Sequence, residues 1–169
     1  ALLIRYNNLA VHLVEASRLD ALDAVLKRGE ALVAREHQQR TPMAISLLQL
    51  RGGWYARKDD QAKALKLFEQ TAALRRALYG PSRALANDLT QVGRTELGLG
   101  QIDRAISTLT EARSMASEYA GPGSPVTLMA AMSLAEGYAH QGRAARARAL
   151  LKGAEPGLKP LGTQGILYG

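Results

Sequence analysis

The sequence has no cysteine, few aromatic residues and no long apolar run. Without cysteine, its 169 residues form no disulfide bond and offer no thiolate to a metal ion. Aromatic residues make up 5% of the chain, and the runs of Val, Ile, Thr and aromatic residues that predict strands are missing. A transmembrane helix needs a stretch of about eighteen apolar residues, and none occurs. We therefore expect no membrane span and a cytoplasmic location.

The abundant residues favour helices. Hydrophobic residues make up 47% of the chain, and Ala and Leu recur with Arg, Gln and Glu between them. These side chains lose little rotamer freedom in a helix. The length is sufficient for one domain with a continuous core. The composition therefore predicts an all-α fold.

Basic residues exceed acidic ones. The 22 Lys and Arg residues against 15 Asp and Glu residues give a net charge of +7, which attracts acidic partners such as nucleic acid. The basic residues are spread along the chain, however, and their densest cluster is Arg143, Arg146, Arg148 and Lys152. At helical spacing this cluster is most simply a solvated helix face. We therefore do not expect nucleic-acid binding.

A pattern of small and large residues repeats along the chain. The small residues Ala10, Gly52, Gly93 and Ala135 recur at intervals of 42, 41 and 42 residues. Each is followed at matching distances by Leu13, Tyr55, Glu96 or Tyr138, by the turn-forming Ser17, Asp59, Gly100 or Gly142, by Leu22, Ala64, Ala105 or Ala147, and by Leu26, Phe68, Leu109 or Leu151. A small residue lets a second helix approach closely, the next residue of the pattern is expected to fill the gap between the helices, and Gly or Asp permits a sharp reversal. Such helix pairs cannot bury their apolar faces alone, so we expect neighbouring pairs to stack.

Capping and turn residues agree with this period. Thr41-Pro42 and Ser124-Pro125 are each typical of an N-cap followed by Pro at the first helical position, while Gly80-Pro81 and Gly121-Pro122 interrupt the chain between repeats. We predict helices at residues 2–16, 18–36, 42–57, 60–78, 83–99, 101–119, 125–141 and 143–154. The repeats then span approximately 1–40, 41–80, 81–122 and 123–154, and residues 155–169, rich in Gly and Pro, form a tail.

Several short segments are typical of one repeat family. Residues 6–10 (Tyr-Asn-Asn-Leu-Ala) closely resemble a Leu-Asn-Asn-Leu-Ala opening, and residues 100–105 and 142–147 resemble a Gly-x-x-x-x-Ala bend. Both are motifs of the tetratricopeptide repeat (TPR) in its kinesin light chain branch, which has many bacterial relatives. The resemblance covers residues 1–154 and implies a right-handed α-solenoid of about four helix-turn-helix repeats. Arg51, Glu96 and Leu22 depart from the family pattern, Arg51 because it stands at a normally apolar position.

The resemblance also implies a place for a ligand, because the first helix of each TPR lines a concave groove. The groove positions of this sequence are Asn8, Gln49, Arg57, Asn87, Gln91, Arg94, Ser133 and Glu136. Their side chains offer donors and acceptors to an extended peptide backbone or a carboxylate, although each residue taken alone is also compatible with a solvated polar face. In family members the position of Asn8 commonly bonds peptide backbone. Asn87 and Gln91 stand where chaperone adaptors have Lys and Arg, so we do not expect such an adaptor.

No set of residues indicates catalysis. Ser133 and His140 share a predicted helix face, but the helical rise separates them by roughly 10 Å, beyond hydrogen-bond reach. Glu136 and His140 are more simply a surface pair. Of the three histidines, His12 and His37 lie in different parts of the first repeat and His140 lies in the fourth repeat, whereas a metal site needs converging ligands. We expect no enzyme activity, no cofactor and no metal ion.

Two functional hypotheses follow. The first is a protein–protein interaction scaffold that binds a peptide or partner segment in its concave groove. The second is a regulatory or self-association domain of a larger bacterial signalling protein, such as a kinase or a transcription regulator. The chain starts inside a predicted helix, without an initiating Met or a signal peptide, which favours a fragment of a larger protein.

Overall fold

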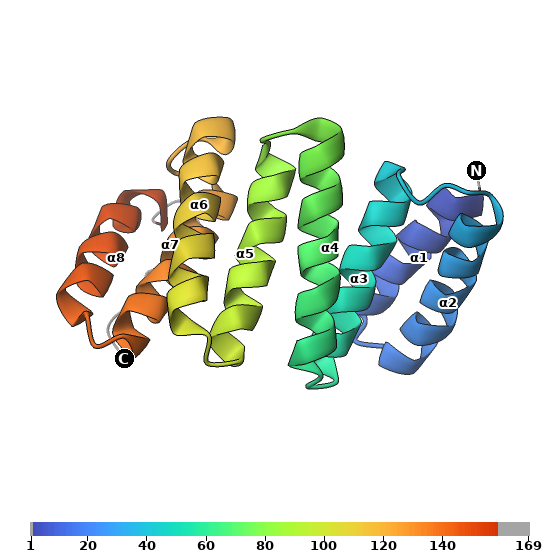
Figure 1. Ribbon diagram of the computed structural model, residues 1–169, viewed down its shortest axis with the longest axis horizontal. Helices are drawn as coiled ribbons and strands as arrows, with labels where there is room; N and C mark the ends of the chain where they lie inside the picture. Colours follow the sequence, from blue (N-terminus) through green and yellow to red (C-terminus); the bar gives the residue numbers. More distant parts are fainter. Residues whose placement is uncertain (1, 159–169) are drawn as a thin grey trace. The chain divides into compact units, whose positions relative to one another are not determined.

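The computed structural model describes residues 2–158, and within this range the fold is all-α (Figure 1). Eight helices follow one another in this part of the chain: α1 (Leu2–Glu15), α2 (Leu19–Arg35), α3 (Pro42–Arg57), α4 (Gln61–Tyr79), α5 (Arg83–Gly98), α6 (Ile102–Ala120), α7 (Pro125–His140) and α8 (Ala144–Leu158). They form four helix-turn-helix pairs, which confirms the predicted fold class. The chain divides into two compact units, an N-terminal unit (Ala1–Leu78) and a C-terminal unit (Tyr79–Gly169), and we describe each by itself.

The predicted helix boundaries are largely confirmed. The first seven helices begin and end within one residue of their predicted positions. The predicted end of the eighth helix at residue 154 was wrong, because α8 continues to Leu158. Pro156 removes one backbone donor, and this loss does not end the helix before Leu158. Residues 159–169 of the predicted tail lie outside the described residues.

Side-chain hydroxyl caps start α3, α5 and α7. The Thr41 hydroxyl accepts a hydrogen bond from the Ala44 amide at 3.3 Å, and the Ser124 hydroxyl accepts one from the Thr127 amide at 3.3 Å. Both caps precede a proline in the first turn, as predicted. Ser82 caps α5 in the same way through the Leu85 amide at 3.2 Å. These bonds satisfy amides that have no partner inside the helix.

The bend inside each helix pair is the same in all four repeats. The predicted turn residues Ser17, Asp59, Gly100 and Gly142 have φ angles of 53°, 63°, 71° and 75°. In each bend the following amide donates to the carbonyl of Leu13, Tyr55, Glu96 or Tyr138, at distances between 2.8 and 3.0 Å. This left-handed conformation closes the carbonyl end of the first helix and reverses the chain. The turn positions inferred from the repeat are therefore confirmed.

The small residues of the repeat mark the closest approach between paired helices. In the N-terminal unit, a Cβ atom added to Gly52 would lie 2.6 Å from the Phe68 ring. In the C-terminal unit, a Cβ atom added to Gly93 would lie 2.5 Å from Leu109 Cγ. The gap opposite these glycines is thus filled by the second helix. Three positions after these glycines, Tyr55 is half-buried, and Glu96 is buried and pairs with Arg104 of α6 at 3.2 Å.

Arg51 makes the main polar contact between α2 and α3. Its side chain is 9% exposed, and it donates from Nε to Glu30 Oε1 at 2.8 Å and from Nη2 to Glu30 Oε2 at 3.0 Å. Nη1 donates to Asp23, which also pairs with Lys27 at 2.9 Å. The guanidinium lies 5.4 Å from the centre of the Trp54 ring. A basic residue is tolerated at a normally apolar position because α2 supplies two carboxylates and α3 an aromatic face.

Candidate functional site

The predicted groove residues lie on the first helices of the repeats, some in each unit. In the N-terminal unit, where α1 packs against α3, Asn8 and Arg57 are exposed and Gln49 is half-buried. In the C-terminal unit, α5 packs against α7 and carries the half-buried Asn87 and Gln91 and the exposed Arg94. On α7, Glu136 is exposed, whereas Ser133 is only 6% exposed and offers little surface to a partner.

The α5 residues form one polar stripe. Asn87, Gln91 and Arg94 follow one another at spacings of four and three, which aligns them along a helix face. Their side chains make no hydrogen bond or ion pair with another described residue, while the Gln91 carbonyl accepts from the Thr95 hydroxyl at 2.8 Å. The amide donors and acceptors of this stripe are therefore free to bind a partner.

The exposed face of α7 adds apolar and charged groups to the C-terminal unit. Met132 is 51% exposed, although methionine is usually buried. His140 Nε2 lies 3.9 Å from Glu136 Oε1, and the Glu136 and His140 side chains are 60% and 56% exposed. Such an open pair is a solvated surface contact, as predicted. With Ser133 nearly buried and His140 exposed, these residues do not form a hydrolytic site.

Asn7 of α1, in the N-terminal unit, was not among the predicted groove residues, and its side chain has an unsatisfied polar atom. Its Oδ1 atom is buried and has no hydrogen-bond partner in the described chain. Buried amide oxygens normally accept a hydrogen bond, so this atom is an unsatisfied buried acceptor, and it offers no accessible surface to a partner. The neighbouring Asn8 is exposed on the same helix. Because both residues are asparagines at adjacent positions, the sequence alone did not indicate which of the two side chains is the more buried.

Trp54 belongs to the core of the N-terminal unit. Its indole Nε1 donates to the Leu19 carbonyl at 2.8 Å, and its ring makes an edge-to-face contact with Tyr55 at 5.0 Å. The side chain packs against the cluster that contains Ala10, Leu26 and Leu47. The hydrogen bond and the apolar contacts thus fix the Trp54 side chain in the core of this unit.

Asp60 acts as a helix cap. Its Oδ1 accepts a hydrogen bond from the Lys63 amide at 3.1 Å, and its Oδ2 pairs with the Lys63 ammonium at 2.6 Å. These hydrogen bonds to Lys63 hold the pKa of the Asp60 carboxyl below its usual value and raise the pKa of Lys63. The Asp60 side chain thus satisfies an amide of the first turn of α4.

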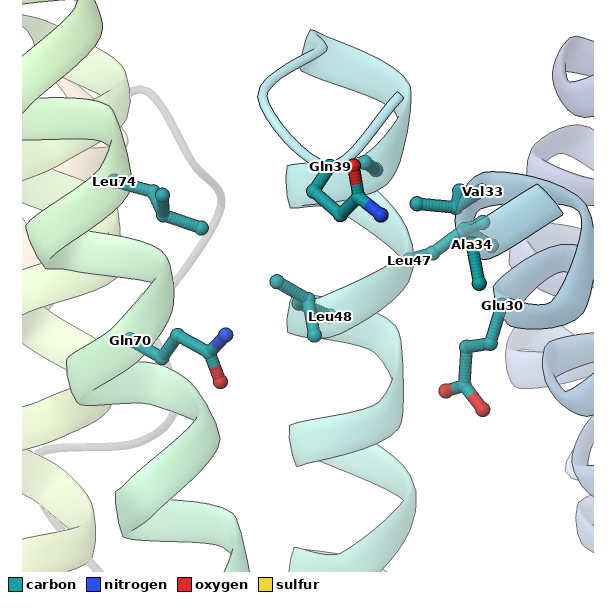
Figure 2. Close-up of a pocket in the computed structure, with 9 residues that line it drawn as sticks. Glu30, Val33, Ala34, Gln39, Leu47, Leu48, Gln70 and Leu74 are labelled. Atoms are coloured by element: carbon teal, nitrogen blue, oxygen red, sulfur yellow. The ribbon is translucent and has the colours of Figure 1, made fainter. Parts of the chain in front are cut away.

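A pocket of about 270 Å³ opens between α2, α3 and α4 of the N-terminal unit. Figure 2 shows Gln70 and Leu74 of α4 pointing across it towards Leu48 of α3. Its wall is largely apolar, and its polar side chains are those of Glu30, Gln39 and Gln70. Both Glu30 oxygens already accept from Arg51, so the carboxylate is not free for a ligand.

Neither metal-binding nor membrane-spanning features occur in the part of the chain that the structure describes. Across residues 2–158, no three His, Cys, Asp or Glu side chains gather closely enough to hold a metal ion. Within the same range, no helix has the length and apolarity needed to cross a bilayer.

Residues 42–118, which comprise α3, α4, α5 and most of α6, match the family pattern of the tetratricopeptide repeat. This part of the chain is a TPR domain. The helix pairs on either side of the matched segment have the same bend and the same positive φ at Ser17 and Gly142. TPR domains are generally protein–protein interaction modules and are typically not enzymes.

Solved structures share this fold at low sequence identity. A Podosopora anserina protein provisionally assigned as a kinesin light chain, with nearly identical TPR-like repeats, has a TM-score of 0.76 and 17% identity; the match covers 95% of this chain and 76% of that protein. BtubC (BKLC) from P. vanneervenii has a TM-score of 0.85 and 15% identity, over 98% of this chain and 66% of its own. The MamA protein has a TM-score of 0.66 and 17% identity, over 99% and 79%. No curated protein matches the sequence. At these identities the likeness shows the fold alone.

Proposed function

We propose that this TPR domain binds an extended segment of a partner protein along the first helices of the repeats in its C-terminal unit, α5 and α7. The observation that carries the proposal is the α5 stripe, where Asn87 and Gln91 are half-buried and their side-chain amides have no partner in the described chain. A half-buried amide loses part of its hydration, so a peptide backbone that pairs with it replaces poorly placed water. Asn and Gln each present a donor and an acceptor, which matches the alternating groups of a peptide backbone.

Charged and apolar groups beside the stripe would add selectivity. Arg94 continues the stripe by one helical turn and is suited to a carboxylate of the partner. On the neighbouring α7, the exposed Met132 offers an adaptable apolar contact. We therefore expect segments with an acidic residue next to an apolar one to bind best. In the N-terminal unit, the exposed Asn8 would make the corresponding backbone contact.

Removing the two stripe amides should weaken peptide binding without unfolding the domain. Peptides selected from a random phage-displayed library on the immobilised chain serve as probes, labelled with fluorescein and titrated by fluorescence anisotropy. The double variant Asn87→Ala with Gln91→Ala should bind them about tenfold or more weakly, because each amide contributes on the order of 1 kcal/mol.

The control variants are Gln70→Ala on α4 and Ser107→Ala on α6, both exposed and on second helices. They should retain wild-type affinity, and all variants should melt within a few degrees of the wild type by circular dichroism. If the selected peptides bind the double variant as tightly as the wild type, the proposal that the α5 stripe binds the peptide is wrong.

A second candidate function is self-association, within a larger regulatory or signalling protein of bacterial type. It is favoured by α1, where Leu2 and Leu9 are 49% and 47% exposed. The equivalent positions of α3, Ala44 and Arg51, are 3% and 7% exposed because α2 covers them. In the fourth repeat, the equivalent Leu134 is 3% exposed. The positions of Leu2 and Leu9 thus normally lie against another helix.

Light scattering tests this candidate. If a second copy covers α1, the wild type should show a concentration-dependent dimer, and Leu9→Glu should be monomeric because a carboxylate at the contact is not compensated. A strictly monomeric wild type at the highest soluble concentration rules it out.

A further inference from the structure

A second cleft lies in the C-terminal unit, lined by residues of α6, α7 and α8 and by none of the α5 stripe. It has a volume of about 380 Å³ and is bounded by α6 and α8, with α7 between them (Figure 1). Leu134, Ala149 and Leu150 form its apolar part, and Arg113 of α6 and Arg146 of α8 supply its charge. None of these residues belongs to the predicted groove.

Neither arginine of the cleft is paired with a carboxylate of the described chain. Both side chains are exposed, and neither makes an ion pair with a described residue. The Arg146 guanidinium lies 5.8 Å from the centre of the Tyr138 ring, which also lines the cleft, and this contact restricts its orientation. Two unpaired cations that line one cleft create a local positive potential, which attracts an anion.

The polar neighbours of the arginines limit the choice of ligand. The Thr110 hydroxyl donates to the Ile106 carbonyl at 2.7 Å, so it is not a free donor. Arg113 also lines an adjoining recess of about 480 Å³ with Ser114, Ser117 and Glu118. Glu118 is the acidic group in this recess, and it would repel an anion placed there. The cleft between Arg113 and Arg146 is therefore the more favourable place for a negative charge.

We propose that this cleft binds a phosphate monoester. A phosphorylated side chain carries a charge of about −1.5 to −2 near neutral pH and three acceptor oxygens, which matches two guanidinium groups. Arginine donates to such oxygens through two parallel N–H groups, and charge-assisted bonds of this kind are stronger than neutral ones. The apolar wall would contact the carbon chain that carries the phosphate.

The structure separates Arg146 from its basic neighbours. The sequence pattern grouped Arg143, Arg146, Arg148 and Lys152 as one solvated face, and Arg146 is the member of this group that lines the cleft. Arg148 lies two residues further on the same helix, is exposed, and is not part of the cleft wall. Arg148 therefore provides a matched control, because it carries the same charge on the same helix but lies outside the cleft.

The test follows the side-chain N–H signals of arginine by NMR. The probes are a short glycine-rich peptide with a central phosphoserine, its unphosphorylated form, and inorganic phosphate, each titrated into the wild-type chain. The phosphopeptide should shift the Arg113 and Arg146 signals with saturation, and the unphosphorylated peptide should not. Arg113→Gln and Arg146→Gln should each weaken binding about tenfold or more, because each removes a charge-assisted contact, and Arg148→Gln should change it less than about twofold.

The outcomes separate the sources of the phosphate. Tighter binding of the phosphopeptide than of inorganic phosphate supports a phosphorylated protein segment, and equal binding supports a small phosphorylated molecule. Shifts without saturation, or an equal loss in Arg148→Gln, would mean non-specific attraction by a basic chain and would overturn the proposal. These measurements follow Arg113 and Arg146, not the α5 stripe. If the proposed peptide binding at the α5 stripe proves wrong, the result for the cleft still stands.

Discussion

Replacing Leu109 by alanine is expected to lower the free energy of unfolding by about 3 kcal/mol, because it leaves a cavity at the centre of the third repeat. Leu109 is fully buried and belongs to a core cluster with Leu97, Ala105 and Leu134. Its Cγ faces Gly93, where even a methyl group has no room. The contact joins α5 to α6 at the closest approach of the pair, so the surrounding side chains cannot easily collapse into the space.

The partner change, Gly93→Ala, should also destabilise the domain, by about 1 kcal/mol. The new methyl group overlaps Leu109, which costs about 1–3 kcal/mol, and the better helix propensity of alanine offsets about 1 kcal/mol of this. In the double variant, the methyl group of residue 93 occupies part of the space that Leu109 vacates. The double variant should therefore lose about 1 kcal/mol less than the two single variants together.

Urea unfolding followed by circular dichroism measures these differences, and Gly53→Ala is the matched control. A Cβ atom at Gly53 has only the Arg57 guanidinium nearby, at 3.5 Å. The same substitution should there stabilise the helix by about 0.5–1 kcal/mol, the opposite sign to Gly93→Ala. Strictly additive losses at Gly93 and Leu109 would contradict a direct contact between them.

Replacing Arg51 by alanine should lower the free energy of unfolding by about 2 kcal/mol. The change removes three hydrogen bonds to Glu30 and Asp23 and the contact with Trp54. Breaking a buried ion pair costs about 3–5 kcal/mol, but the Asp23 and Glu30 side chains are 23% and 37% exposed and regain hydration, which reduces the cost. Arg51→Met keeps most of the packing volume and should lose about half as much.

The loss at Arg51 should depend on pH. Hydrogen bonds from Lys27 and then from Arg51 hold the pKa of Asp23 below its usual 3.8, while burial acts in the opposite direction. Burial lowers the pKa of Arg51, but its hydrogen bonds to Glu30 and Asp23 raise it by more, so Arg51 stays charged throughout. A carboxyl with a lowered pKa in the folded state stabilises the fold above its unfolded pKa, and this contribution is lost as the pH falls through the folded value.

Urea unfolding at about pH 6 and about pH 3 measures this dependence. The wild type should lose more stability than Arg51→Met on acidification, so the difference between them narrows. Lys27→Met removes the other cation at Asp23 and serves as the control, since Lys27 is exposed and should cost less than about 1 kcal/mol at the higher pH. A constant difference between wild type and Arg51→Met would show that the ion pair contributes nothing to the effect.

The local architecture was determined by the sequence itself. Helix boundaries follow from capping residues such as Thr41 and Ser124, from prolines and from helical periodicity, all of which act within a few residues along the chain. The positive φ of Asp59 and Gly100 was equally predictable, because the bend needs a residue that tolerates the left-handed region. The interval between small residues also indicated Gly52 and Gly93 as points of close approach.

Only the tertiary structure decided which polar side chains meet and which stay free. Arg51 lies 28 residues from Asp23 and 21 from Glu30, and no local pattern pairs them. The same is true of Arg113 and Arg146, which line one cleft from different helices, and of Ser133, which the helix pattern placed on an open face and the packing of α7 buries. The physical reason is that secondary structure depends on neighbours within one helical turn, whereas burial and charge pairing depend on how separate helices pack.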